Sequence, residues 1–347
     1  MSTESGEISV LVSPATVAHP RQSEASILPM DDGSLLLAWT DFYGGDWHDE
    51  GPACILGRRS EDRGGTWSDS FVLQENIGGL NCMSASLLRL ASGRILLAFG
   101  RKDSAGDLLH AMVRWSDDGA KDWCDPVELT QGDHYWCITN DRLVQLRTGR
   151  ILYPLCEHEI GAHCWISDDG GNWRMGKGAV LPPEGVSYTE PTVVELPGGG
   201  VAMYIRTTAG NIHIARSKDG DEWTMHKNHP SDMCGHPDAG PNAAYSPCMV
   251  KRVPGTDDLL LVWNNNRIRT PLTAAVSHDA GESWQHLRNL EEMDGWPPRL
   301  THAYPSIAFL ASDVHLTYWE THGHETAERL VHLRYRRLPL SWFYERC

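Results

Sequence analysis

The chain has 347 residues, of which 41% are hydrophobic and 22% charged, so it can bury a substantial core and is not of the disordered class. Its formal net charge of -16 at pH 7 disfavours nucleic acid and anionic membrane surfaces as partners. No stretch approaches the roughly 20 apolar residues of a membrane span, and the first residues lack the basic and apolar parts of a signal peptide, so we expect a cytoplasmic protein.

Six segments share one pattern, which is an alternating apolar run, a short turn and a second, strongly apolar run. This pattern is typical of a β-hairpin. In chain order, hairpins are predicted at residues 25–39, 85–99, 142–155, 192–205, 248–263 and 306–319. The first five turns contain a glycine, which adopts a positive φ at little cost: Gly33, Gly93, Gly149, Gly199 and Gly255. The sixth turn has Ser312 and Asp313 instead.

A second motif, Ser-x-Asp-x-Gly-x-x-Trp, follows the hairpins at a regular interval. Complete copies span residues 60–67 and 277–284, and imperfect copies span 116–123, 167–173 and 217–223. The interval of about 50–60 residues is close to the length of one four-stranded propeller blade. Ser and Asp in such an aspartate box are expected to bond backbone amides of the turn, while Trp fills the space between strands. We therefore interpret the boxes as structural.

No helical period separates the hairpins, which argues against a sheet with alternating helices. The sequence predicts an all-β fold, a six-bladed β-propeller with aspartate-box turns, which forms a single domain over residues 1–347. Nine scattered cysteines predict reduced thiols. The residues Cys137, Cys156, His158, His163 and Cys164 match no zinc-binding spacing, so we expect neither a metal nor a cofactor.

Polar residues recur at both strand ends of each hairpin. Nine residues before the turn stand Glu24, Ser84, Asn140, Glu190, Ser246 and Tyr304, and about eight residues after it stand Asp41, Arg101, Glu157, Arg206 or Thr207, Asn264 and Glu320. In a propeller the first strand of a hairpin begins at one mouth of the central channel and the antiparallel second strand ends there. Two polar sets that converge on one mouth predict a concave binding site.

The repeated boxes on six hairpins resemble the sialidase (neuraminidase) superfamily over nearly the whole chain. Glu190 stands in EPTVVELPGG, which is similar to the sialidase E-x-x-V-V-E-L-x-D-G motif, and Tyr304 stands ahead of VHLTYWE, as a sialidase tyrosine stands ahead of L-Y-E. The resemblance implies that Tyr304 is a nucleophile and Glu190 its base partner. It also implies that Asp49 is the acid/base residue, and that Arg206 and Arg269 belong to a triad that grips the substrate carboxylate.

One part of this resemblance is missing. Sialidases begin their first blade with R-I-P-A, whereas the aligned stretch here is Ser23–Ser26, so Glu24 stands beside the place of the first triad arginine. Two arginines can still bind a carboxylate, and Arg21 or Arg142 could take the third place. Because Glu24 repels an anionic sugar, we expect little cleavage of ordinary sialosides and a preferred substrate that presents a hydroxyl or amine to this carboxylate.

The candidate catalytic residues are Asp49, Glu190 and Tyr304. The candidate substrate-binding residues are Glu24, Asp41, Arg101, Asn140, Arg142, Glu157, His158, Arg206, Tyr245, Asn264, Arg269, His302 and Glu320.

The leading hypothesis is an exo-acting, retaining glycoside hydrolase of sialidase-like type that acts on a sialic-acid-like or other acidic or modified sugar. Two alternatives stay open. The first is a polysaccharide lyase, with His158 or His302 acting alongside Tyr304, or a hydrolase of another sugar on the same propeller. The second is a non-catalytic propeller that binds glycans. Each hypothesis has a carbohydrate partner and leaves the oligomeric state open.

Overall fold

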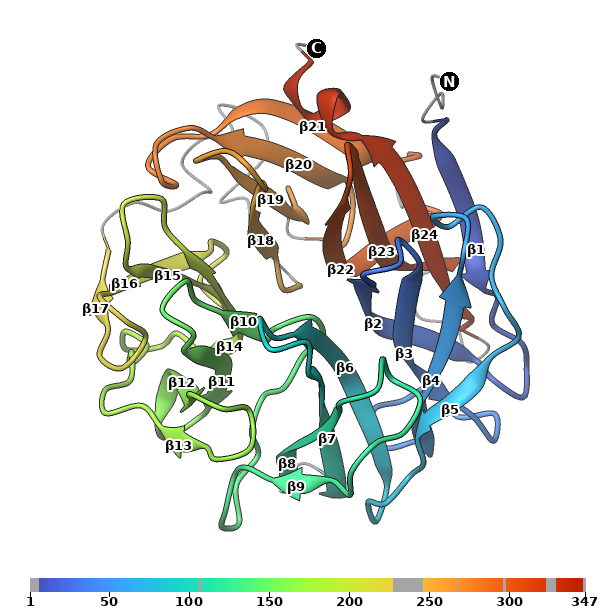
Figure 1. The fold of residues 1–347 in the computed structure, drawn as a ribbon, viewed down its shortest axis with the longest axis horizontal. Helices are drawn as coiled ribbons and strands as arrows, with labels where there is room; N and C mark the ends of the chain where they lie inside the picture. Colours follow the sequence, from blue (N-terminus) through green and yellow to red (C-terminus); the bar gives the residue numbers. More distant parts are fainter. Residues whose placement is uncertain are drawn as a thin grey trace.

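The computed structural model describes residues 6–105, 108–226, 246–266, 268–295, 298–322 and 329–345. Across these ranges the regular structure is β-strand, apart from one 3-10 helix, η2 (Leu340–Tyr344). The prediction of an all-β protein is therefore confirmed. Figure 1 shows the sheets standing around a common centre in sequence order, from blue to red. No helix within the described ranges is both long and apolar enough to cross a membrane.

Four sheets have four strands each, and in each of them consecutive strands pair antiparallel. They consist of β6 (Asn81–Arg89), β7 (Ile95–Ser104), β8 (Leu108–Ser116) and β9 (Val127–Glu128); β10 (Val144–Gln145), β11 (Ile151–Glu157), β12 (Gly161–Ser167) and β13 (Arg174–Met175); β14 (Tyr188–Glu195), β15 (Val201–Thr207), β16 (His213–Ser217) and β17 (Thr224–Met225); and β18 (Met249–Arg252), β19 (Leu259–Asn264), β20 (Leu272–Ser277) and β21 (Gln285–Glu291).

A larger sheet joins the two ends of the chain. Its eight strands are β22 (Leu300–Leu310), β23 (Asp313–His322), β24 (Val331–Pro339), β2 (Arg21–Pro29), β3 (Leu35–Phe42), β4 (Ala53–Ser60) and β5 (Phe71–Gln74), with β1 (Ile8–Ser13) paired to β24. A parallel bridge between Arg21 and Val331 connects β2 to β24, and the other pairs in the sheet are antiparallel. Because β1 pairs with β24, the first described strand lies beside the last one.

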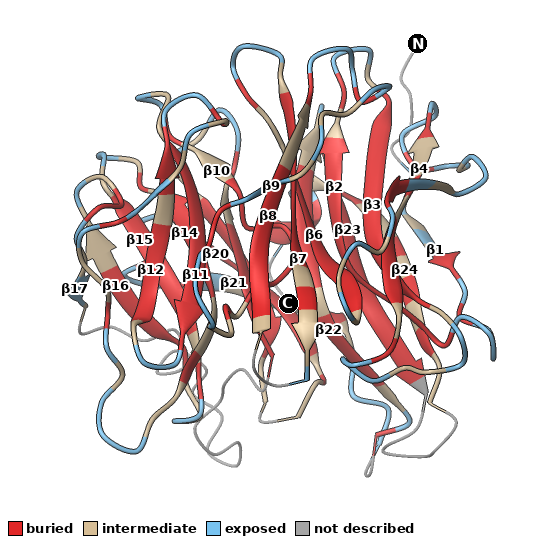
Figure 2. Cartoon of the chain, turned by 90° about the horizontal axis from the view of Figure 1, so that it is seen from below, coloured by how far each residue is buried: buried red, intermediate tan, exposed pale blue. Residues whose placement is uncertain are grey.

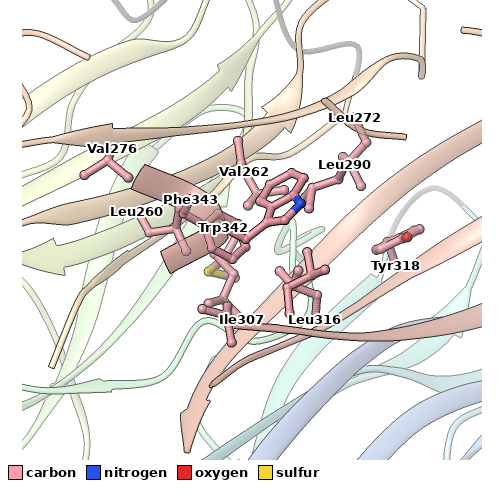
Figure 3. Packing of buried hydrophobic residues seen from close by; sticks show 14 of the residues in the cluster. Leu260, Val262, Leu272, Val276, Leu290, Ile307, Leu316, Tyr318, Trp342 and Phe343 are labelled. Atoms are coloured by element: carbon pink, nitrogen blue, oxygen red, sulfur yellow. The ribbon is translucent and has the colours of Figure 1, made fainter. Parts of the chain in front are cut away.

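All six predicted hairpins are present, as β2–β3, β6–β7, β10–β11, β14–β15, β18–β19 and β22–β23. Their strands carry apolar side chains toward both neighbouring sheets, which is why Figure 2 shows them as largely buried, with exposure concentrated in the loops. One cluster between β18–β20 and β22–β23 also receives Trp342 and Phe343 from η2, as Figure 3 shows. Burial of these large side chains fixes the last turn of the chain against two sheets.

The aspartate boxes act as the sequence predicts. In the first box the Ser60 hydroxyl accepts the Gly64 amide at 2.7 Å, and Asp62 accepts the Thr66 amide at 2.7 Å. Gly64 has a φ of +87°, which an L-residue adopts only with strain. The Trp67 ring meets the Tyr335 ring edge-on, with 5.1 Å between centroids. The box therefore shapes the turn and anchors it on β24.

Candidate active site

Four inner strands carry a β-bulge at the position that the count from the turn singles out. The register shifts between Ser23 and Ser26 in β2, and β6, β14 and β22 have matching shifts. Inside these bulges four non-glycine residues have a positive φ: Glu24 (56°), Ser84 (65°), Glu190 (45°) and Tyr304 (56°). Such strain persists only where the surroundings enforce it, and a bulge re-aims side chains. Each bulge lies at the same distance before its turn. A single count back from the turn therefore finds residues whose side chains have the same orientation.

Arg21, at the start of β2, lies beside Glu24 and Asp49. Its Nη1 donates to Asp49 Oδ1 at 2.5 Å, its Nη2 donates to Glu24 Oε1, and its Nε donates to the Ser23 hydroxyl at 2.9 Å. The guanidinium also stacks on Phe42, with 4.4 Å from Cζ to the ring centroid. The sequence offers Arg21 or Arg142 for the place beside Glu24 that the missing arginine leaves. The structure has the buried Arg21, from the same strand as Glu24, at this place.

The loop that carries Asp49 is fastened to the second sheet. The Asn81 side chain donates to the carbonyl groups of Asp49 and Gly51, at 2.8 and 2.9 Å. The buried Lys102 donates from Nζ to the Asp49 carbonyl at 3.2 Å and to Glu50 at 2.9 Å. Neither Asn81 nor Lys102 was among the residues predicted from the sequence. Both are polar residues at strand ends, which is the only signal that would have found them.

Tyr304 lies among the side chains of the opposite strands. Arg206 on β15 bonds the Glu190 carboxylate, and its charge acts on the Tyr304 phenol. Arg269 approaches the Tyr304 ring from another direction, with 5.4 Å from Cζ to the centroid, and lies 4.5 Å from the Trp319 ring. The phenol therefore stands next to a carboxylate and two guanidinium groups.

The charges of the site set its protonation states. Arg21 is the main cause that holds the pKa of Asp49 below its usual range, with Lys102 and Arg269 acting in the same direction. Burial raises the pKa of Tyr304, and the Glu190 charge adds to this against the two arginines. Burial likewise raises the pKa of Glu24, although Arg21 opposes it. At rest Asp49 is thus ionised and the Tyr304 phenol is protonated.

The repeat pattern seen in the sequence and in the boxes has a counterpart in other proteins. Residues 33–316 match the family described as BNR repeat-like domain. The chain belongs to this family. Its structure is similar to a protein of unknown function from Dyadobacter fermentans, with a TM-score of 0.74 and 21% identity over 96% of this chain and 99% of that one.

Two enzymes have the same fold as this BNR repeat-like protein. The intramolecular trans-sialidase from Ruminococcus gnavus superimposes with a TM-score of 0.75 and 14% identity, over 97% of this chain and 98% of that one. The NanB sialidase from Streptococcus pneumoniae superimposes with a TM-score of 0.73 and 13% identity, over 96% of this chain and 70% of that one. The BNR repeat-like chain therefore has the sialidase fold.

Several candidate residues of the BNR repeat-like protein lie on other faces of their strands. Asp41 pairs with His19 at 2.8 Å and accepts from Gln22, on the face of β2 and β3 opposite to Arg21. Arg101 pairs with Asp103 at 2.8 Å and with Glu128 at 3.1 Å. At these two positions the expected contribution to the Tyr304 cluster is not seen, because adjacent residues of a strand point to opposite faces.

Three further candidates take part in a separate buried network or in turn structure. Glu320 binds Arg334 through both oxygens, at 2.6 and 3.0 Å, and lies 3.5 Å from His302 Nε2. These interactions lower the pKa of Glu320 to about 2, against the effect of burial. Glu157 accepts the backbone amides of Glu159 and Ile160, at 2.7 and 2.9 Å, and so closes the turn after β11.

The two asparagines of the predicted rings connect separate sheets. Asn140 donates to the Ala25 carbonyl at 2.6 Å and to the Tyr304 carbonyl at 3.3 Å. Asn264 donates to the His302 carbonyl at 2.9 Å. Both side chains therefore hold the backbone at the start of β22, and Asn140 directly fixes the residue that bears the phenol.

Of the remaining candidates, Arg142 and His158 do not join the Tyr304 cluster. Arg142 is buried, and its Nη1 lies 3.7 Å from the Met249 sulfur rather than beside Glu24. His158 is exposed in the turn after β11. Tyr245 lies outside the described residues. Within the ranges that the structure describes, no group of three or more His, Cys, Asp or Glu side chains is arranged to hold a metal ion.

Proposed function

We propose that this protein is a retaining, exo-acting glycoside hydrolase that acts on a glycoside of a sugar acid. The observation that carries the proposal is the position of Tyr304, whose phenol neighbours the Glu190 carboxylate, Arg206 and Arg269. Arg21 adds a third guanidinium, next to Asp49. The sialidase fold of the Ruminococcus gnavus and Streptococcus pneumoniae enzymes supports the same assignment.

In the first proposed step the Tyr304 oxygen attacks the anomeric carbon and forms a covalent glycosyl–tyrosine bond. The phenol proton passes to Glu190, because a free phenol with a raised pKa is a weak nucleophile. The glycosidic bond breaks, and Asp49 in its acid form protonates the leaving oxygen. A tyrosine suits an anomeric carbon that bears a carboxylate, because a neutral phenol approaches that anion more easily than a second carboxylate does.

In the second proposed step water replaces tyrosine at the anomeric carbon. Asp49, now a carboxylate, takes a proton from the water, and Glu190 returns its proton to the departing phenolate. Two displacements at one carbon retain its configuration. The three arginines bind the substrate carboxylate through charge-assisted hydrogen bonds during both steps.

We propose further that the domain is a six-bladed propeller. Six hairpins support this count, and so does the eight-stranded sheet, which divides at the Arg21–Val331 bridge into β22–β23–β24–β1 and β2–β3–β4–β5. Each half then corresponds to one blade of four strands. An experimental structure counts the blades directly.

The function is tested with a panel of aryl glycosides, including those of sialic acid and related keto-sugar acids, on wild type and Tyr304→Phe. We expect release of the aryl group from a sugar-acid glycoside, with a loss of at least about two orders of magnitude in turnover for the variant. Trapping of a glycosyl adduct on Tyr304, located by mass spectrometry, would support retention. Turnover by Tyr304→Phe at the wild-type rate would contradict the tyrosine assignment. An unsaturated product that absorbs ultraviolet light would indicate a lyase instead.

A further inference from the structure

Arg21 already holds two carboxylates before any ligand binds. One terminal nitrogen donates to Asp49 at 2.5 Å and the other donates to Glu24, while Nε is engaged by Ser23. The Arg21 side chain is only 6% exposed, so a third carboxylate cannot reach the guanidinium without changing one of these partners. Arg21 is therefore not a vacant anion site.

The two carboxylates differ in how easily they can leave. The Glu24 side chain is 2% exposed and also accepts hydrogen bonds from Ser84 at 3.2 Å and from Thr40 at 3.5 Å. The Asp49 side chain is 53% exposed, and the anchors of its loop, Asn81 and Lys102, bond its backbone carbonyl rather than its carboxylate. The Asp49 carboxylate can thus move away while its loop stays in place.

We propose that the carboxylate of a sugar-acid ligand displaces Asp49 from Arg21, and that Asp49 then takes up a proton from solvent and becomes the acid of the reaction. This inference rests on the proposed function. At rest Asp49 is an ionised carboxylate paired with Arg21. It becomes the acid of the reaction only when an anionic ligand has bound. A glycoside without a carboxylate leaves the ion pair intact and finds no acid.

The charges around Asp49 give this exchange its direction. The groups whose charges interact with Asp49 come from several elements. They are Arg21 and Glu24 on β2, Lys102 on β7, Arg269 in the segment before β20, and Tyr135. Arg21 is the strongest of these influences and keeps the pKa of Asp49 low. A ligand carboxylate on Arg21 removes that hydrogen bond and adds a like charge nearby, and both changes raise the pKa of Asp49.

Proton uptake on binding determines the direction in which ligand affinity changes with pH. Between the low pKa of free Asp49 and its raised pKa in the complex, the complex holds one more proton than the free protein and ligand. Affinity for the acid therefore falls as pH rises across that window, by about tenfold per pH unit at the most. Outside the window the affinity is independent of this group.

The experiment compares N-acetylneuraminate with its neutral methyl ester on the full chain. Isothermal titration in two buffers of different ionisation enthalpy counts the protons taken up, and the affinity is followed from pH 4 to pH 8. We expect close to one proton for the acid within the window and none for the ester. Asp49→Asn should abolish the uptake and bind the acid about tenfold or more tighter near pH 7, because the competing anion is gone.

Asp46→Asn is the matched control, since Asp46 lies in the same loop but bonds His48 at 2.8 Å. It should behave as wild type in every titration. If the acid binds without proton uptake and Asp49→Asn does not strengthen binding, the displacement is overturned while recognition of sugar acids stands. Uptake that persists in Asp49→Asn assigns the proton to another group, such as Glu24, and also overturns it. If neither ligand binds and no sugar-acid glycoside in the aryl panel is turned over, the proposed function fails and the displacement fails with it.

Discussion

Asn81 holds the backbone of Asp49, with 2.8 Å between the side-chain amide nitrogen of Asn81 and the Asp49 carbonyl oxygen. Asn81 is fully buried at the start of β6, whereas Asp49 lies in an exposed loop between β3 and β4. A rigid sheet therefore positions the backbone of a catalytic candidate whose partly exposed carboxylate bonds Arg21. The proposed exchange at Arg21 requires this arrangement, in which the contacts that hold the backbone do not involve the carboxylate.

Asn81→Ala should slow turnover without preventing folding. The variant removes the hydrogen bonds to Asp49 and Gly51, so we expect a stability loss of about 1–3 kcal/mol and a reduction in kcat that exceeds any change in KM. Asn76→Ala is the control, because Asn76 makes a hydrogen bond of the same length to Leu80 but does not contact Asp49. Equal kcat values for the two variants would contradict a positioning role for Asn81.

Glu190→Gln should lower turnover by at least about two orders of magnitude, because it removes the proposed acceptor of the phenol proton. The unfolding midpoint should change little, since the amide keeps the shape of the carboxylate. Glu195→Gln on the same strand is the matched control, because Glu195 accepts the exposed Arg147 amide at the far end of β14. Steady-state kinetics of both variants on the substrate found in the screen decide the outcome. A Glu190→Gln enzyme with near wild-type turnover would rule out this base.

Most of the fold could be predicted from the sequence, because its signals are local and repeated. A hairpin needs only alternation and a turn, and each aspartate box supplies its own hydrogen bonds within a few residues. The division of the eight-stranded sheet depends instead on β1, which pairs with β24 from the other end of the chain. No local pattern in residues 8–13 indicates that partner.

The site was predicted in part, and the errors at Asp41 and Arg101 have one cause. Backward counting found Glu24, Glu190 and Tyr304 because the bulge lies at a constant distance from the turn. Forward counting selected Asp41 and Arg101, whereas the side chains that reach the site are Thr40, which bonds Glu24, and Lys102, which approaches Asp49. A count that is off by one residue exchanges the two faces of a strand.

Acid should destabilise the protein partly through His315. This side chain is fully buried on β23, its Nδ1 lies 2.8 Å from the Tyr335 hydroxyl, and burial lowers its pKa to about 4. The unfolded chain has a histidine pKa near 6.5, so between pH 6.5 and 4 only the unfolded state binds the proton. Stability due to this group is complete above pH 6.5 and falls as the pH drops toward 4.

Denaturant unfolding at pH 7, 5.5 and 4.5 tests this effect. His315→Gln should weaken the pH dependence of the unfolding free energy by up to about 1.4 kcal/mol per pH unit, which corresponds to one proton. His278→Gln is the control, because His278 is substantially exposed and pairs with Asp258. If both variants keep the wild-type slope, the acid sensitivity arises from other groups.

The first aspartate box should be more sensitive to a side chain at its glycine than the first hairpin turn is. Gly64 has a φ of +87°, and a Cβ at this position would lie 1.8 Å from the Tyr335 hydroxyl oxygen, which itself donates to the Arg63 carbonyl at 3.0 Å. Gly33 has nearly the same conformation, with a φ of +83°, but no atom lies within 4 Å of the corresponding Cβ position. The two glycines therefore differ in sterics and not in backbone strain.

Gly33→Ala should cost about 1–2 kcal/mol of unfolding free energy, which is the expense of placing an L-residue in the left-handed region. Gly64→Ala should cost about 1–3 kcal/mol more, because the methyl group displaces Tyr335 from its contact with Trp67 and from its hydrogen bond to Arg63. Urea denaturation of the two variants measures the difference, and the circular dichroism of the aromatic residues reports whether the Trp67–Tyr335 contact is lost. Equal losses in the two variants would mean that the box depends on its backbone conformation alone, and that Tyr335 does not lock it to β24.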